Sequence, residues 1–289
     1  DHLLFGTIWR DSVLQLRATS CCDSGFGHGL ALRLSGLGMQ VFAGVLDSEG
    51  DGAKKLKEWD PERIAVLQMD VTNPEHIAQV KETINKRLGQ KGLWGLVNNA
   101  GLLLCPVDAE LQSTSSLRRL MEVNFLSAVT VTQTFLPLIR KAKGRVVGVS
   151  SLAGKSNNIP GVVCFIHTFE KSLVSLACFC RVLRLEMLQW GVHVAVIQPS
   201  GFKTSMELLI EPIMLILILL LPSVLDTMSQ ATKQDMSPVL DCIEHALLST
   251  HPRPLYCPGK SAWLLPFLYT HLPTATFDRF TVRVRNIQK

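Results

Sequence analysis

The sequence predicts an α/β fold in which helices cover both faces of a doubly wound parallel sheet. Two observations predict it: short apolar runs alternate with longer stretches of helical period, and polar residues or glycine close each run. Strands and helices in this order give a parallel sheet with right-handed crossovers, which gathers ligand sites at the carboxyl ends of the strands. The 289 residues, 47% of them hydrophobic, are enough for one large core.

The first strand has the weakest signal. We expect it at residues 13–19, although Gln15 and Arg17 are polar where a central parallel strand is normally apolar. A helix with Leu30, Leu34 and Leu37 on one face follows it. The remaining strands are expected at residues 41–43, 64–69, 93–97, 145–149 and 192–197.

The clearest helix start in the sequence is at Asn73 and Pro74, because asparagine is a good N-cap and proline fits the first helical position. Its expected apolar face comprises Ile77, Val80, Ile84 and Leu88. Residues 117–139 and 171–189 have the same period, so we expect a helix in each.

We expect one domain at residues 19–289, preceded by an unassigned segment at 1–18 that includes the weak first strand. Within the domain, the very apolar segment 205–235 is expected to form a substrate lid or part of the core, and residues 236–289 the substrate side of the C-terminus. The uninterrupted apolar part of the lid, residues 213–221, would be about 14 Å long as a helix. A bilayer core is about 30 Å thick, so this segment does not span it.

Charge and cysteine content argue against several other functions. The net charge of +5 is spread along the chain and is not concentrated beside aromatic residues, so no nucleic-acid partner is expected. The eight cysteines have no metal-ligand spacing, which predicts no metal site and buried thiols in a reducing compartment. No charged-then-apolar leader opens the sequence, so we expect any targeting segment or anchor to lie outside it.

A glycine-containing stretch, SCCDSGFGHGL at residues 20–30, comes directly after the first expected strand. Gly25 and Gly27 would let backbone N–H groups and a helix N-terminus approach a pyrophosphate, which a Cβ atom would obstruct. Taken alone, the two glycines fit an ordinary tight turn equally well.

Several further motifs follow this loop in a fixed order: Asp70-Val71, Asn98-Asn99-Ala100-Gly101, Asn124, Ser150-Ser151 and Pro199-Ser200-Gly201. Together with the loop they resemble the short-chain dehydrogenase/reductase family over residues 19–204 and 236–280. The stretches VFAGVL, VLQMDVTNPEHI and GLWGLVNNAG are similar to the 17β-hydroxysteroid dehydrogenases of that family. The resemblance implies a Rossmann-type fold and a nicotinamide-dependent oxidoreductase.

The resemblance also implies which residues bind the cofactor. Asp70 would contact the adenine, and Thr204 would hold the nicotinamide carboxamide. The full implied set is Ser20, Gly25, Phe26, Gly27, Asp70, Val71, Asn98, Ala100, Gly101, Lys171 and Thr204. Gly44 stands where NAD enzymes often have an acid, but Asp47 is three residues later and no arginine is there to receive a 2′-phosphate. We therefore expect NAD rather than NADP.

The implied catalytic group departs from the family at one position. In the family, a tyrosine exchanges the proton of the substrate oxygen, and a lysine four residues later lies on the same helix face. By resemblance, Asn124, Ser151 and Lys171 supply the asparagine, serine and lysine of this group. The tyrosine is missing, since Tyr256 and Tyr269 both lie far downstream.

Two alignments remain open for the missing tyrosine. Alignment on Lys171 puts His167 in its place, and an imidazole can both give and take a proton. Counting back without gaps from Arg184 instead puts Phe169 there and Leu173 at the lysine position, which would leave no catalytic group. A packed or exposed histidine without any catalytic role is a further alternative for His167.

The expected substrate is a small, flat, hydrophobic secondary alcohol or ketone such as a steroid or retinoid, with oxidation of a 17β-hydroxyl by NAD as the leading hypothesis. The alternative is a protein of the same fold that binds a dinucleotide or a partner without turnover. By resemblance we expect the endoplasmic reticulum membrane. A homodimer and contact with a membrane surface stay open.

Overall fold

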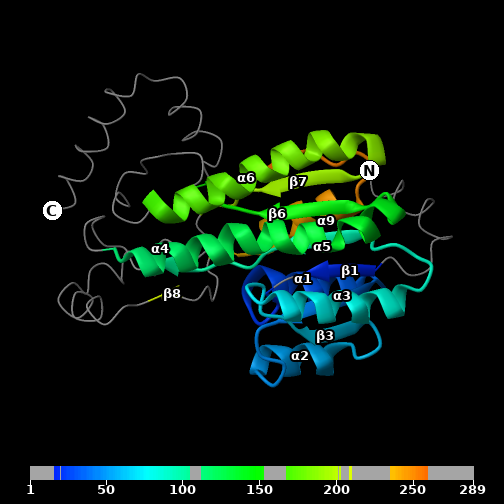
Figure 1. The fold of residues 1–289 in the computed structure, drawn as a ribbon. Helices are drawn as coiled ribbons and strands as arrows, with labels where there is room; N and C mark the ends of the chain where they lie inside the picture. The colour runs from blue at the N-terminus through cyan, green and yellow to red at the C-terminus, as the bar shows by residue number, and fades with distance from the viewer. Residues whose placement is uncertain are drawn as a thin grey trace.

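The computed structural model describes residues 16–19, 21–104, 112–152, 167–200, 202, 208–209 and 235–259 (Figure 1). Seven parallel strands form the main sheet, in the order β3-β2-β1-β4-β6-β7-β9. These strands are β1 (Leu16–Thr19), β2 (Gln40–Val45), β3 (Ile64–Gln68), β4 (Gly95–Asn98), β6 (Arg145–Val149), β7 (His193–Ile197) and β9 (Leu255–Tyr256). A separate short ladder pairs β5 (Leu103–Leu104) with β8 (Leu208–Leu209). The predicted α/β fold with a parallel sheet is confirmed.

Helices cover both faces of the sheet. They are α1 (Gly25–Gly36), α2 (Asp51–Trp59), α3 (Pro74–Leu88), α4 (Thr114–Met121), α5 (Ser127–Ala142), α6 (His167–Met187) and α9 (Ser237–Leu248). The start of α3 is as predicted, because the Asn73 side chain accepts hydrogen bonds from the backbone N–H groups of Glu75 and His76 and Pro74 occupies the first turn. The predicted apolar face of α3 is buried throughout.

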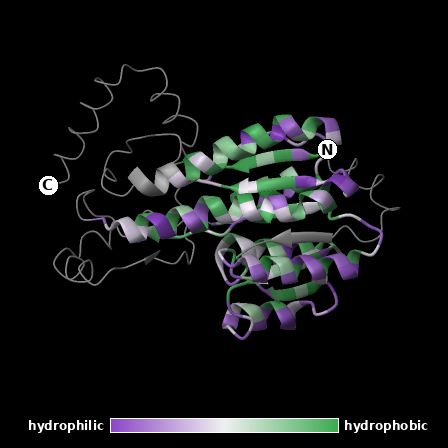
Figure 2. Cartoon of the chain, viewed as in Figure 1, coloured by the Kyte–Doolittle hydropathy of each residue, from purple (hydrophilic) through white to green (hydrophobic). Residues whose placement is uncertain are grey.

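Two hydrophobic cores lie on opposite faces of the sheet, because neighbouring strand residues point in opposite directions. On β6, Val146 belongs to the core with α3, α5 and α6, whereas Val147 belongs to the core with α1, α2 and α9. Val194 and Ala195 divide in the same way on β7. Figure 2 shows mainly hydrophobic residues on these strands and a mixture of hydrophilic and hydrophobic residues along the helices around them.

The first strand is present as β1 (Leu16–Thr19), central in the sheet between β2 and β4, and the rest of its expected range, 13–15, lies outside the described residues. Two other element predictions need correction. Leu37 does not share the buried face of α1, because it lies just after the helix ends and is 51% exposed. The helix expected at 117–139 is divided into α4, one π-helical turn at Glu122–Leu126, and α5.

The C-terminal end of α9 is fixed to the sheet by two side chains. The guanidinium of Arg145, at the start of β6, donates to the carbonyl oxygens of Ala246 at 3.2 Å and Ser249 at 2.8 Å. The indole of Trp94 donates to the carbonyl of Leu247 at 3.1 Å, and the Arg145 guanidinium lies over its ring. These donors satisfy carbonyl groups that a helix end leaves without partners.

The cysteines agree only in part with the expectation of buried thiols. Among those that the structure describes, Cys22 and Cys180 are buried, but Cys178 is exposed on α6. Burial raises the pKa of Cys180 to about 12, so this thiol is not reactive. Within the described part of the chain, no helix has the length and apolar character needed to cross a bilayer.

Candidate functional site

The loop between β1 and α1 is built for close backbone contact. Gly25 has φ +61°, in the left-handed region that glycine adopts without strain. A Cβ atom at Gly27 would collide with the Cys21 carbonyl oxygen and come within 2.9 Å of the Asn99 amide nitrogen. The start of α1 therefore lies against the loop with no room for a side chain, as a phosphate-binding helix N-terminus requires.

Cys21 has a backbone conformation that suits glycine. Its φ is +58°, which is rare for a residue with a Cβ atom. The Asn99 side chain donates to its carbonyl oxygen at 3.3 Å, which connects the loop to the end of β4. The backbone at Cys21 thus has the geometry of a glycine, although the residue has a side chain.

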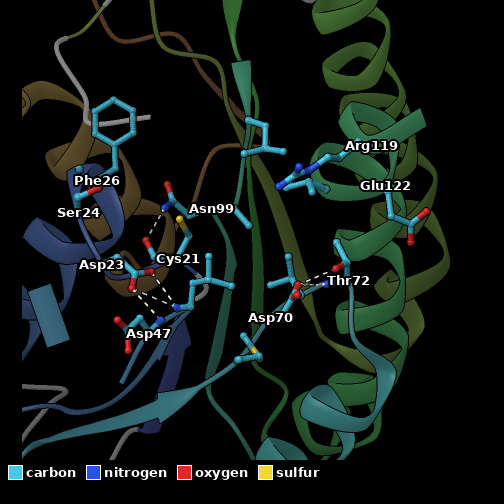
Figure 3. A pocket seen from close by; sticks show the side chains of 18 residues that line it. Cys21, Asp23, Ser24, Phe26, Asp47, Asp70, Thr72, Asn99, Arg119 and Glu122 are labelled. Atoms are coloured by element: carbon cyan, nitrogen blue, oxygen red, sulfur yellow. Dashed lines mark hydrogen bonds between the residues drawn. The ribbon is translucent and has the colours of Figure 1, made fainter. Parts of the chain in front are cut away.

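A pocket of about 500 Å³ opens beside this loop at the carboxyl ends of β1 to β4 (Figure 3). The glycine loop and the residues after β2 and β3 form one wall, and α4 with the π-helical turn forms the other. The predicted cofactor residues among its lining are Gly25, Phe26, Asp70, Val71, Ala100 and Gly101. The structure thus brings six separate predicted positions together around one cavity.

Asp23 is a pocket residue that the motif analysis did not select. Its carboxylate accepts hydrogen bonds from the backbone N–H groups of Leu46, at 3.0 and 3.1 Å, and Asp47, at 3.4 Å (Figure 3). This contact connects the glycine loop to the chain after β2. It places two carboxylates, those of Asp23 and Asp47, at the end of β2, and Leu46 between them is 57% exposed.

Asp70 follows β3 and faces the same pocket. Its carboxylate accepts hydrogen bonds from the Thr72 hydroxyl at 2.7 Å and the Thr72 backbone N–H at 2.9 Å. Burial raises the pKa of Asp70, but these hydrogen bonds and the electrostatic effect of His76 and Arg119 outweigh burial and lower it. Asp70 is therefore an ionised hydrogen-bond acceptor at neutral pH.

Not every predicted cofactor residue faces the pocket. Asn98 is buried and donates a hydrogen bond to the Thr132 hydroxyl at 2.8 Å, so it joins β4 to α5. Gly27 lies behind the loop, where its role is to let α1 approach Asn99. Ser20 and Thr204 lie outside the described residues.

Asn124 lies in the π-helical turn and is 1% exposed. Its side-chain oxygen accepts from the Leu102 N–H at 2.7 Å, and its amide donates to the Leu102 carbonyl at 3.0 Å and to the Ser172 hydroxyl at 3.2 Å. A single side chain thus joins the segment after β4 to α6. Single π-helical turns within α-helices are frequent at functional sites.

The predicted catalytic serine follows β6. The Ser151 hydroxyl donates a long hydrogen bond, 3.4 Å, to the Pro199 carbonyl, and its neighbour Ser150 donates to the Leu173 carbonyl at 3.0 Å. His167 and Lys171 are in the first turns of α6, but their side chains lie outside the described part of the structure. Ser172 and Leu173 are thus the α6 residues that contact Asn124 and Ser150.

Comparison with known proteins agrees with this geometry. The family model described as short chain dehydrogenase matches residues 20–212. The chain belongs to the short-chain dehydrogenase family. Members of this family are NAD(P)-dependent oxidoreductases, and the pocket has the glycine loop and polar strand ends that such a cofactor needs.

Relatives and solved structures place the chain within this family. It is 40% identical over 275 residues to estradiol 17-beta-dehydrogenase 2 of Mus musculus, covering 89% of this chain and 71% of the relative. It is 35% identical over 275 residues to retinol dehydrogenase 16 of Homo sapiens, covering 89% and 84%. A short-chain dehydrogenase structure from Streptomyces avermitilis shares the fold with a TM-score of 0.75 at 21% identity, covering 96% of this chain and 98% of that one. The chain is thus a short-chain dehydrogenase related to hydroxysteroid and retinol dehydrogenases.

Proposed function

We propose that this short-chain dehydrogenase binds NAD and oxidises a hydrophobic secondary alcohol of the steroid class, a 17β-hydroxyl being the leading candidate. The observation that carries the proposal is the cavity between the glycine loop and the π-helical turn. Behind this loop, Gly27 leaves room only for hydrogen at its Cα, so α1 lies close against the loop. When bound there, NAD accepts a hydride from the alcohol carbon.

Two carboxylates support NAD over NADP. Asp23 and Asp47 stand at the end of β2, where the adenosine ribose of a dinucleotide binds in folds of this type. They suit ribose hydroxyl groups as hydrogen-bond acceptors and repel a 2′-phosphate. No lysine or arginine of the described pocket lining lies on that wall, since Arg119 is on the opposite one.

In the proposed reaction, the Ser151 hydroxyl binds the substrate oxygen and His167 takes its proton. Lys171 binds the nicotinamide ribose and favours the neutral imidazole of His167. Asn124, in the π-helical turn, fixes the positions of Leu102 and α6 through its three hydrogen bonds. The shorter reach of an imidazole relative to a phenol predicts slower turnover than a tyrosine would give.

The relatives support the proposed substrate class, because their names refer to estradiol and retinol. The apolar composition of residues 205–235 suits a flat hydrophobic substrate as well.

We also propose that the chain associates with the endoplasmic reticulum membrane through residues 205–235. Cell fractionation of the chain with and without residues 205–235 tests this, and release of both forms into the soluble fraction would contradict it.

A homodimer is the third part of the proposal, and the surface of α6 supports it. Val182 is 55% exposed and Leu185 is 58% exposed, and their spacing of three residues puts them on one helix face. Exposed apolar groups of this kind favour association. Light scattering should give a dimer for the parent and a monomer for Val182→Glu with Leu185→Glu, and a monomeric parent would refute it.

The second candidate function is dinucleotide binding without turnover, and the contacts of α6 favour it. Ser172 contacts Asn124 and the Leu173 carbonyl accepts from Ser150, so this part of α6 faces the site. The ungapped alignment from Arg184 puts Leu173 at the lysine position, and the same alignment puts Phe169 at the tyrosine position. Phe169 at this position could not exchange a proton.

A turnover assay separates the two functions. NADH absorbance at 340 nm is followed with purified protein, NAD and either estradiol, testosterone or retinol, beside His167→Ala and Lys171→Ala. Turnover that both substitutions abolish supports the oxidoreductase with His167 as proton acceptor. Absence of turnover with intact NADH binding would overturn the oxidation and leave the binding function, and turnover that survives His167→Ala would overturn the role of His167.

A further inference from the structure

Arg119 is a pocket residue that no motif of the sequence selects. It is in α4, whose first turn is capped by the Ser113 hydroxyl, which accepts from the Ser116 N–H at 3.1 Å. The next residue, Leu120, is fully buried and fixes the rotation of the helix. Arg119 is exposed, and it lines the pocket together with Glu122 and Val123, one turn later.

Figure 3 shows Arg119 on the wall opposite the glycine loop, with its side chain directed into the pocket. Ser24 and Phe26, at the start of α1, are on the facing wall. A ligand group at the N-terminus of α1 thus has backbone amides on one side and the wall that carries Arg119 on the other.

Arg119 is a positively charged residue in a pocket whose other charged lining residues are acidic. Of the described residues that line it, Asp23, Asp47, Asp70 and Glu122 are acidic, and Arg119 is the one lysine or arginine. The glycine loop at residues 20–30 contains no lysine or arginine either. A dinucleotide has two negative charges on its pyrophosphate, so the acidic lining alone would repel it.

The neighbouring acids already have hydrogen-bond donors. Asp23 accepts from the backbone of Leu46 and Asp47, and Asp70 accepts from Thr72. None of the ion pairs between described residues includes Arg119. Its charge also lowers the pKa of Asp70, but Arg119 forms no ion pair with a described carboxylate, so its guanidinium can still donate hydrogen bonds to an anion in the cavity.

We propose that Arg119 binds the pyrophosphate of the dinucleotide from the wall opposite α1. The inference rests on the cofactor site proposed above and adds to it a cation that the family motifs do not supply. A guanidinium suits this role, because it stays charged and donates two parallel hydrogen bonds to phosphate oxygens. Arg119 is a binding residue in this scheme and takes no part in proton transfer.

Arg118 provides a matched control, because it is the adjacent arginine on α4 but does not line the pocket. Dissociation constants of ADP-ribose, NADH and adenosine are measured by calorimetry for the parent, Arg119→Gln, Arg119→Lys and Arg118→Gln. Arg119→Gln should weaken ADP-ribose and NADH roughly tenfold and leave adenosine unchanged, since adenosine has no phosphate. Arg118→Gln should change each constant less than about twofold.

Three other results would overturn the inference. Equal ADP-ribose affinity in the parent and Arg119→Gln would show that Arg119 does not contact the pyrophosphate. Equal weakening of adenosine and ADP-ribose would assign Arg119 to the nucleoside instead. A folded parent that binds none of the three ligands would refute the cofactor site itself. A parent that binds them but oxidises no alcohol would refute only the proposed oxidation, and the Arg119 result would stand on its own.

Discussion

The Asn124 side chain forms hydrogen bonds with both backbone polar groups of Leu102. It accepts from the Leu102 N–H at 2.7 Å and donates to the Leu102 carbonyl at 3.0 Å. An amide side chain can accept through its oxygen and donate through its nitrogen at the same time. Asn124→Asp would keep the acceptor, lose both donors and introduce a buried charge. The segment after β4 and the start of α6 thus depend on one side chain.

We expect Asn124→Asp to lower the free energy of unfolding by at least 2 to 3 kcal/mol, about the desolvation penalty of the groups left without partners. Urea unfolding measures this change. The exposed Asn85→Asp on α3 is the control and should change stability by less than about 0.5 kcal/mol. Similar unfolding midpoints for the two variants would contradict the account of Asn124.

Gly27→Ala should abolish dinucleotide binding. The new methyl group would meet the Cys21 carbonyl and the Asn99 amide, which are held in place by the hydrogen bond between them. Gly36 in the last turn of the same helix has nothing within 4 Å, so Gly36→Ala should leave binding intact and raise stability by up to about 1 kcal/mol. NADH fluorescence titration checks both, and normal binding by Gly27→Ala would mean that the loop does not serve as the phosphate site.

Cys21→Gly should increase the free energy of unfolding by about 0.5 to 1 kcal/mol, because the left-handed backbone at φ +58° costs a residue with a Cβ atom more than it costs glycine. Lys143, with φ +47° at the end of α5, is the matched control, and Lys143→Gly should stabilise by a similar amount. Only Cys21→Gly should also tighten NADH binding, since only Cys21 lines the pocket. A loss of stability in Cys21→Gly would show that its side chain contributes more than its backbone costs.

Stability should fall between pH 7.5 and pH 5.5 because of His245. Burial lowers the pKa of His245 below its usual 6.5, and the positive charges of Arg253 and Arg145 lower it further. The unfolded chain therefore takes up the proton first as the pH falls below about 6.5, and the folded state loses stability there. His245→Gln, which can still bond the Tyr256 hydroxyl, should reduce this slope in urea unfolding, whereas His251→Gln at the exposed surface should not.

The parts of the fold that local chemistry determines were predictable from sequence. The start of α3 follows from Asn73 and Pro74, and β6 has the predicted bounds because all five of its residues are buried in a parallel sheet. The first strand was harder, since Arg17 is in a central strand and only its pairing with β2 and β4 identifies it. The two residues of β9 have no periodicity to detect.

The site shows a similar division. Short motifs found Gly25, Asp70 and Ala100, because each is next to the end of a parallel strand and such ends meet at one edge of the sheet. The π-helical turn was not predicted, since residues 117–139 have an unbroken apolar period. Asp23 could have been found from its place in the glycine loop. Arg119 could not, because only the packing of α4 brings it to the pocket. The roles of Ser151, His167 and Lys171 stay predictions.

The attachment of α9 by Arg145 and Trp94 has a consequence for synthesis of the chain. Arg145 is buried, and its acceptors are the carbonyl groups of Ala246 and Ser249, about a hundred residues later in the sequence. Until α9 leaves the ribosome, the guanidinium has no such acceptors, and the core that includes Val239, Ile243 and Leu247 is open on one face. The nascent protein should therefore need chaperone protection until its last helix emerges.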